Sequence, residues 1–161
     1  MKRFSSLVLF CVFLTTSCSG VNSVIKKPYQ NHETSLSITD LTAKSEDFMD
    51  AGVLLRQALE KRLESTNYIL INHGSSSKYQ LKYQVVEYKE GSRVARSLML
   101  GAVSKLGKAR LKIKAALFNG KKMLGRWDVE SWLEDGLLGG SEKTLFVKAA
   151  DEIVDHLQGD Y

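Results

Sequence analysis

The stretch RLKIKAALFNGKKMLGRWDVESW, from Arg110 to Trp132, decides the fold of this chain. In its first half, apolar residues recur at every second position, which is the pattern of a strand with one buried face. These residues are Leu111, Ile113, Ala115 and Leu117. Asn119 and Gly120 follow as a two-residue turn, whose positive φ values match the twist of paired strands. The stretch therefore predicts a β-hairpin.

The returning strand of this hairpin carries both tryptophans of the chain. Met123, Trp127 and Val129 are spaced so that they share one face of the strand. Trp132 is out of phase with Trp127. We therefore expect at least one of the two indoles at a strand end or partly exposed.

Similar patterns predict the remaining elements. Three strands are expected before the hairpin, from Ser35 to Thr42, from Tyr68 to Ile71 and from Tyr79 to Tyr88. Apolar residues three and four apart predict two amphipathic helices. They run from about Phe48 to Ser65 and from about Glu142 to Leu157, with Ser141 as the cap of the second. The acids Asp151, Glu152 and Asp155 are expected on the solvated face of that helix.

The order of these elements predicts an α+β fold, a mostly antiparallel four- to five-stranded sheet with two helices packed on one face. This single domain is expected to span residues 34–161, long enough to bury one hydrophobic core. The tyrosines of the strand from Tyr79 to Tyr88 share a face with apolar residues. Core packing is therefore favoured over base stacking, and no nucleic-acid partner is predicted.

The N-terminus has the pattern of a bacterial lipoprotein signal. Lys2 and Arg3 precede an apolar run from Leu7 to Leu14, which is too short for a bilayer that needs about 20 residues. Small residues then lead into Cys18. We expect residues 1–17 to be removed and Cys18 to carry the lipid. More than one acyl chain on this cysteine would give a stable membrane anchor.

One feature departs from the usual signal, because Thr15 stands three residues before the cysteine, where leucine is common. The alternative is an ordinary signal cut after Ser17 or Gly20, which would leave a free periplasmic protein. Ser19 follows the cysteine in place of the aspartate typical of inner-membrane retention. The outer membrane, with the domain facing the periplasm, is therefore the expected location. Residues 18–33 are polar and predict a flexible tether.

Composition excludes several classes of site. Removal of the signal takes away two cations and no acid, so the formal charge falls from +5 to +3, and basicity alone does not indicate nucleic-acid binding. The only cysteines are lost with the signal or lipidated, which leaves none for a disulfide or a thiolate metal site. The histidines lack metal-ligand spacing and are expected at the surface or in loops: His32, His73 and His156. No metal or cofactor is predicted.

A basic and apolar connector joins two predicted strands from Ser92 to Lys108. It could lie on a membrane surface or accept a partner. Alternatively, it is a crossover that packs its leucines on the sheet and leaves its charges in solvent. The candidate contact residues are Arg93, Arg96, Leu98, Leu100, Lys105 and Lys108.

The connector also carries a family resemblance. Gly91-Ser92-Arg93 leading to Arg96, then Gly101, Gly107-Lys108-Ala109 and the alternating strand after Arg110, resemble the domain-of-unknown-function-4410 family of bacterial lipoproteins. This resemblance covers about Ser35 to Leu157. It implies a strand, a short turn, a second strand and a final helix after the connector, and it transfers no active-site residues.

Three functions are considered. The first is an outer-membrane-anchored lipoprotein without enzymatic activity, which binds another envelope protein or itself within an assembly or secretion system. The second is an oligomeric pore or membrane-remodelling component that uses the connector from Ser92 to Lys108. The third is an enzyme built on Asp40, His73 and His156, but no motif links these residues. We therefore expect that the protein is not an enzyme.

Overall fold

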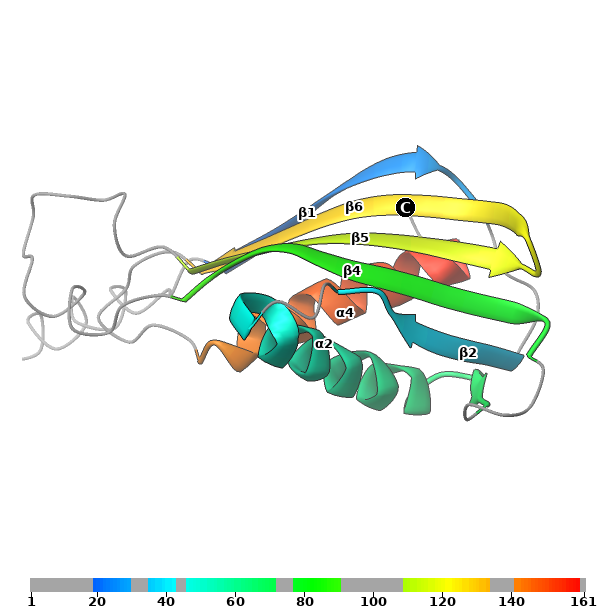
Figure 1. Cartoon of the computed structure of the whole chain (residues 1–161), viewed down its shortest axis with the longest axis horizontal. Coiled ribbons are helices and arrows are strands. Elements are labelled where there is room, and N and C mark those ends of the chain that lie inside the picture. Colours follow the sequence, from blue (N-terminus) through cyan, green and yellow to red (C-terminus); the bar gives the residue numbers. More distant parts are fainter. Residues whose placement is uncertain are drawn as a thin grey trace, which may run out of the picture.

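The computed structural model describes residues 19–29, 35–42, 46–71, 77–90, 109–133 and 141–159. Within these ranges, six strands form one sheet and two helices lie against it (Figure 1). The strands are β1 (Ser19–Lys27), β2 (Ser35–Asp40), β3 (Ile69–Leu70), β4 (Tyr79–Lys89), β5 (Ala109–Asn119) and β6 (Lys122–Leu133). The helices are α2 (Glu46–Glu64) and α4 (Lys143–Gln158).

The sheet is open and mixed, with the strand order β1-β6-β5-β4-β2-β3. Strands β1, β6, β5 and β4 are antiparallel neighbours, whereas β2 runs parallel to both β4 and β3. The chain passes through α2 between β2 and the next strands, and such a crossover returns it in the same direction. The α+β fold is confirmed, but the sheet formed by the described residues has six strands instead of four to five, and it is mixed, with three antiparallel and two parallel pairings.

The core lies between the sheet and the two helices, both of which cover the same face (Figure 1). On α2, Leu55, Leu59 and Leu63 are fully buried, as their four-residue spacing predicts. The apolar residues of α4 and the inward-facing residues of β4, β5 and β6 complete the core. Burying one such leucine contributes about 1.5–3 kcal/mol relative to leaving it in water.

The predicted hairpin is present, although its turn is displaced by one residue. Gly120 has a φ of 58°, no residue other than glycine has a positive φ in the described ranges, and Asn119 pairs with Lys122. Because Asn119 and Lys122 are paired, the two turn residues are Gly120 and Lys121. Glycine stands at the position with the positive φ, which it adopts without steric cost. A bulge leaves Leu124 without a partner on β5. It places Met123 on the opposite face from Trp127, so the shared face predicted for these two residues is wrong.

The polar tether predicted over residues 18–33 is wrong for Ser19–Lys27, which form β1 at one edge of the sheet. Two of the β1 residues on the helix side are serines and Ile25–Lys27 are exposed, so β1 lacks a run of large buried side chains. An edge strand tolerates this composition because only one of its edges pairs with a neighbour. The domain in the structure therefore begins earlier than residue 34.

Candidate functional site

The lipid and contact residues predicted from the sequence lie outside the described residues. They are Cys18, Arg93, Arg96, Leu98, Leu100, Lys105 and Lys108. The structure does describe the strands on either side of them. Cys18 immediately precedes β1, and the connector joins the end of β4 to the start of β5. The positions of these strand ends show where the undescribed segments leave the domain.

These strand ends meet at one end of the sheet. Ser19 pairs with Leu133 of β6, and Leu133 pairs with Ala109 of β5. Arg110 then pairs with Lys89, the last residue of β4. The start of β1 and both attachment points of the connector therefore lie at the same end, which we call the Ser19 end (Figure 1).

Helix α4 holds the first residue of β1 at this end. The Lys148 ammonium donates a hydrogen bond to the Ser19 carbonyl oxygen over 2.8 Å. The hydroxyl of the buried Ser131 on β6 donates a hydrogen bond to the Leu145 carbonyl oxygen over 3.0 Å. The residue that follows Cys18 is therefore tied to both the sheet and the helix layer.

The face of the sheet away from the helices carries ion pairs between neighbouring strands. Arg110 Nε lies 3.0 Å from Glu130 Oε1, and Lys112 Nζ lies 2.7 Å from Glu87 Oε2. The hydrogen bond from Lys112 holds the pKa of Glu87 below its ordinary value. Each carboxylate is therefore paired with a cation from a neighbouring strand. Such pairs are typical of a solvated sheet face, and they do not place two carboxyl groups together for acid–base catalysis.

A polar cluster joins β1 to α4 on the inner side of the sheet. Ser23 donates a hydrogen bond to Glu152 Oε1 over 2.5 Å, and its Oγ lies 2.7 Å from His156 Nε2. His156 Nε2 is also 3.2 Å from Glu152 Oε1, and its ring stacks on Trp127 with a centroid separation of 5.9 Å. His156 is only 3% exposed. The expectations of a surface histidine and a solvated Glu152 are therefore wrong.

This cluster contains a serine, a histidine and an acid, but its geometry does not suit nucleophilic catalysis. In a catalytic triad the acid orients one ring nitrogen while the nucleophile contacts the other. Ser23 and Glu152 both contact Nε2 of His156. The cluster therefore attaches the edge strand to α4. The sequence places Ser23 in a predicted tether, so the four-residue spacing of Glu152 and His156 is the one sequence feature that indicates this cluster.

Asp40 belongs to a second network, at the end of β2. Its carboxylate accepts a hydrogen bond from the Thr42 amide over 2.7 Å, and the Tyr83 hydroxyl donates to the Gly52 carbonyl oxygen over 2.9 Å. Burial, together with the charge of Asp40, raises the pKa of Tyr83. A Cβ atom at Gly52 would collide with the Asp40 carboxylate. This close packing joins β2, β4 and α2.

The three residues considered for an enzyme are not brought together by any contact that the structure describes. Asp40 and His156 have separate sets of partners on different elements, and His73 lies outside the described residues. Within the described ranges, no group of three or more histidine, cysteine, aspartate or glutamate residues could hold a metal ion. Neither α2 nor α4 has the length and apolar character that crossing a membrane requires.

Comparison with known proteins gives a likeness in structure alone. No family model matches the chain, and no curated protein matches it. The fold is similar to that of PelC from Paraburkholderia phytofirmans, solved as a dodecamer, with a TM-score of 0.57 and 10% identity over 88% of this chain and 99% of that chain. A dodecamer of a PelC point variant has a TM-score of 0.50 and 11% identity, over 89% and 100% of the two chains.

A third structure, a candidate lipoprotein from Caulobacter crescentus, is only loosely similar. It has a TM-score of 0.42 and 23% identity over 74% of this chain and 87% of that chain. At these identities the likeness to PelC extends to the fold and no further. The resemblance to the domain-of-unknown-function-4410 family stays a prediction, because no family model matches.

Proposed function

We propose that the chain is an outer-membrane-anchored periplasmic lipoprotein without enzymatic activity, which serves as a protein-interaction module of an envelope assembly or secretion system. One observation supports this function above the others. Ser19, Leu133 and Ala109 lie side by side, so the proposed lipid site at Cys18 and the proposed contact connector leave the domain at the same end. A lipid at Cys18 would bring the connector to the membrane surface.

The position of β1 makes this anchor short. Cys18 is directly followed by a strand residue that Lys148 and β6 hold in place. A multiply acylated cysteine anchors stably, and no flexible spacer separates it from the sheet. We infer that the Ser19 end stays at the membrane surface and that partners approach the domain there.

A second candidate function is an oligomeric pore or membrane-remodelling component that uses the segment from Ser92 to Lys108. The observation that favours it is the dodecameric state of PelC, whose fold this chain resembles. In addition, β6 is the only neighbour of β1 among the described strands, so the other edge of β1 has backbone groups that another strand could use. We propose self-association as the form that this function would take.

Crosslinking in native envelopes, followed by pull-down of the full chain, tests the first function. We expect a defined partner that is lost in Cys18→Ala and in the pair Arg96→Glu with Leu100→Asp. The matched control is Lys61→Glu with Val53→Asp, which makes the same two kinds of change on the exposed side of α2. Retention of the partner by all variants would contradict the proposal. Large homo-oligomers without a partner would favour the pore.

A further inference from the structure

The outer face of the sheet carries one distinctive row of residues at the Ser19 end. Gly20 pairs with Trp132, Trp132 with Arg110, and Arg110 with Lys89, so one row crosses β1, β6, β5 and β4. Trp132 stands between the buried residues Ser131 and Leu133, so it faces away from the helices. The row therefore combines an indole with two cations and contains no acid.

The indole of Trp132 lies over Gly20 on this face. A Cβ atom at Gly20 would collide with the Trp132 ring, so the ring covers the glycine directly. The ring is only half-buried, because the helices lie on the other face of the sheet (Figure 1). Tryptophan is enriched where a protein meets the headgroup level of a bilayer, since its ring is apolar and its N–H is polar.

Both charged residues of the row itself, Arg110 and Lys89, are cations. Arg110 forms an ion pair with Glu130. Glu130 precedes Trp132 by two residues on β6, which is about 7 Å along the strand. Lys89 is exposed and makes no ion pair with another described residue. Further along the same face Lys112 is paired with Glu87, and the acid Glu90 follows Lys89 in the chain.

We propose that Trp132, Arg110 and Lys89 bind the anionic phospholipid headgroups of the membrane that holds the lipid anchor. This inference rests on the proposed function, because Gly20 is two residues from Cys18 in the sequence, a length of chain that spans at most about 7 Å when fully extended. A membrane at the Ser19 end reaches this row first. A soluble polyanion would reach the more distant cations of the same face, Lys114 and Arg126, equally well.

The test uses the full mature chain with Cys18→Ser, so that the acyl chains do not hide a weaker contact. Binding is measured by co-sedimentation with vesicles of phosphatidylglycerol and phosphatidylethanolamine, and with phosphatidylcholine vesicles, in 0.1 M salt. Tryptophan emission is recorded in parallel. Trp127 is fully buried and serves as an internal reference. We expect binding to the anionic vesicles with a blue shift that Trp132→Phe abolishes.

Two matched double variants locate the surface. We expect Lys89→Gln with Arg110→Gln to weaken binding by roughly 10- to 30-fold, since each basic residue near an anionic surface contributes about fivefold. The control pair, Lys114→Gln with Arg126→Gln, is expected to change it less than twofold. Equal losses in both pairs would overturn the inference. A Trp132 response to polyphosphate but not to vesicles would also overturn it, in favour of a soluble polyanion.

The mass of the protein isolated from native envelopes tests the lipid separately. A lipidated Cys18 with no vesicle response from the row would leave the proposed function standing and refute the headgroup surface. Vesicle binding through the row in a protein whose Cys18 carries no lipid would support the surface and refute the anchor.

Discussion

At the scale of single residues, two glycines define how the two tryptophans pack. Gly125 lies under Trp127, whose ring is fully buried in the core, and Gly20 lies under Trp132 on the outer face. In each case a Cβ atom would come into steric conflict with the indole. The two sites therefore present the same kind of contact in two different environments.

We predict that Gly125→Ala destabilises the protein more than Gly20→Ala. Trp127 has no space to move, and overpacking of this kind costs about 1–3 kcal/mol. Trp132 can turn toward solvent, so the cost of Gly20→Ala should stay below about 1 kcal/mol, partly offset by the lower backbone entropy of alanine in the unfolded chain. Urea unfolding of both variants measures the difference. Equal costs would show that the outer indole is as constrained as the core indole.

The partial exposure of one tryptophan was predictable, because Trp132 is out of phase with Trp127 along one strand. The contact between Gly20 and Trp132 could not be predicted from the sequence. Gly20 meets Trp132 only because β1 pairs with β6, and this pairing joins residues more than a hundred positions apart. The burial of His156 depends on the same pairing, since Ser23 of β1 is one of its partners.

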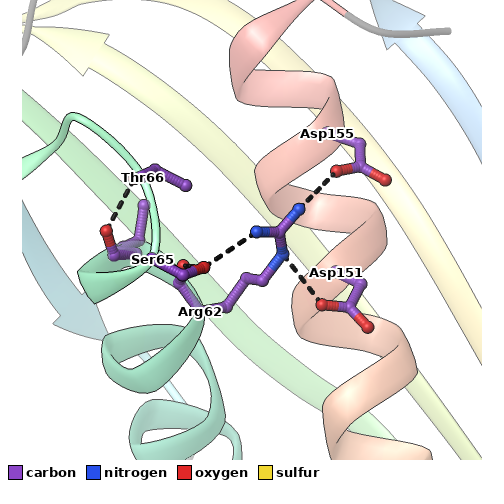
Figure 2. Close-up of polar contacts among 6 residues, drawn as sticks. Arg62, Ser65, Thr66, Asp151 and Asp155 are labelled. Carbon is purple, nitrogen blue, oxygen red and sulfur yellow. Dashed lines mark hydrogen bonds and ion pairs between the residues drawn. The ribbon is translucent and has the colours of Figure 1, made fainter.

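At the scale of elements, one arginine joins the two helices. Arg62 of α2 places Nε 2.9 Å from Asp151 Oδ1 and Nη2 3.3 Å from Asp155 Oδ1, both on α4 (Figure 2). Its Nη1 also donates to the Ser65 hydroxyl over 2.9 Å. The side chains of Asp151 and Asp155 are partly exposed, in line with the predicted solvated face, and the structure adds that both are paired with Arg62 of α2.

We predict that Arg62→Ala costs more stability than Asp151→Asn. Without Arg62, two carboxylates four residues apart on α4 repel each other, and the expected loss at pH 7 is about 1–2 kcal/mol. Burial raises the pKa of Asp151, with Arg62 opposing that rise. Its ionised form is thus disfavoured by folding, and Asp151→Asn should change stability by less than about 0.5 kcal/mol.

Urea unfolding at pH 7 and at pH 3 tests this order. The pKa of Asp151 is raised in the folded state, so protonated Asp151 favours folding. This contribution to the free energy of unfolding is complete at a pH below the ordinary pKa of 3.8, and it is lost as the pH rises through the pKa of the folded state. The difference between Arg62→Ala and the parent should therefore shrink at pH 3, where the aspartates take up protons. A larger loss in Asp151→Asn than in Arg62→Ala at pH 7 would contradict the prediction.

At the scale of the whole molecule, the sequence predicts best the elements with a regular hydrophobic period, either two residues for a strand or 3.6 residues for a helix. The alternation in β4 and β5 and the leucine spacing of α2 identify elements that the structure contains at nearly the predicted bounds. Two features depend on spatial neighbours instead. The parallel pairing of β2 with β4 depends on how α2 packs, and β1 has small and polar residues that local pattern alone assigns to a tether.

The role of β1 gives the last prediction, which compares two truncated proteins, one beginning at Ser19 and one at Pro28. A flexible tether could be removed without loss of stability. Removal of β1 instead takes away one of the two antiparallel neighbours of β6, including Ile25 opposite Trp127. It also breaks the contacts of Ser23 with Glu152 and His156. We expect the protein beginning at Ser19 to unfold like the full mature chain. The protein beginning at Pro28 should lose several kilocalories per mole of stability, or fail to give a cooperative thermal transition by circular dichroism. Identical transitions would mean that Ser19–Lys27 contributes nothing to the fold, and the short anchor inferred from its position would then have to be abandoned.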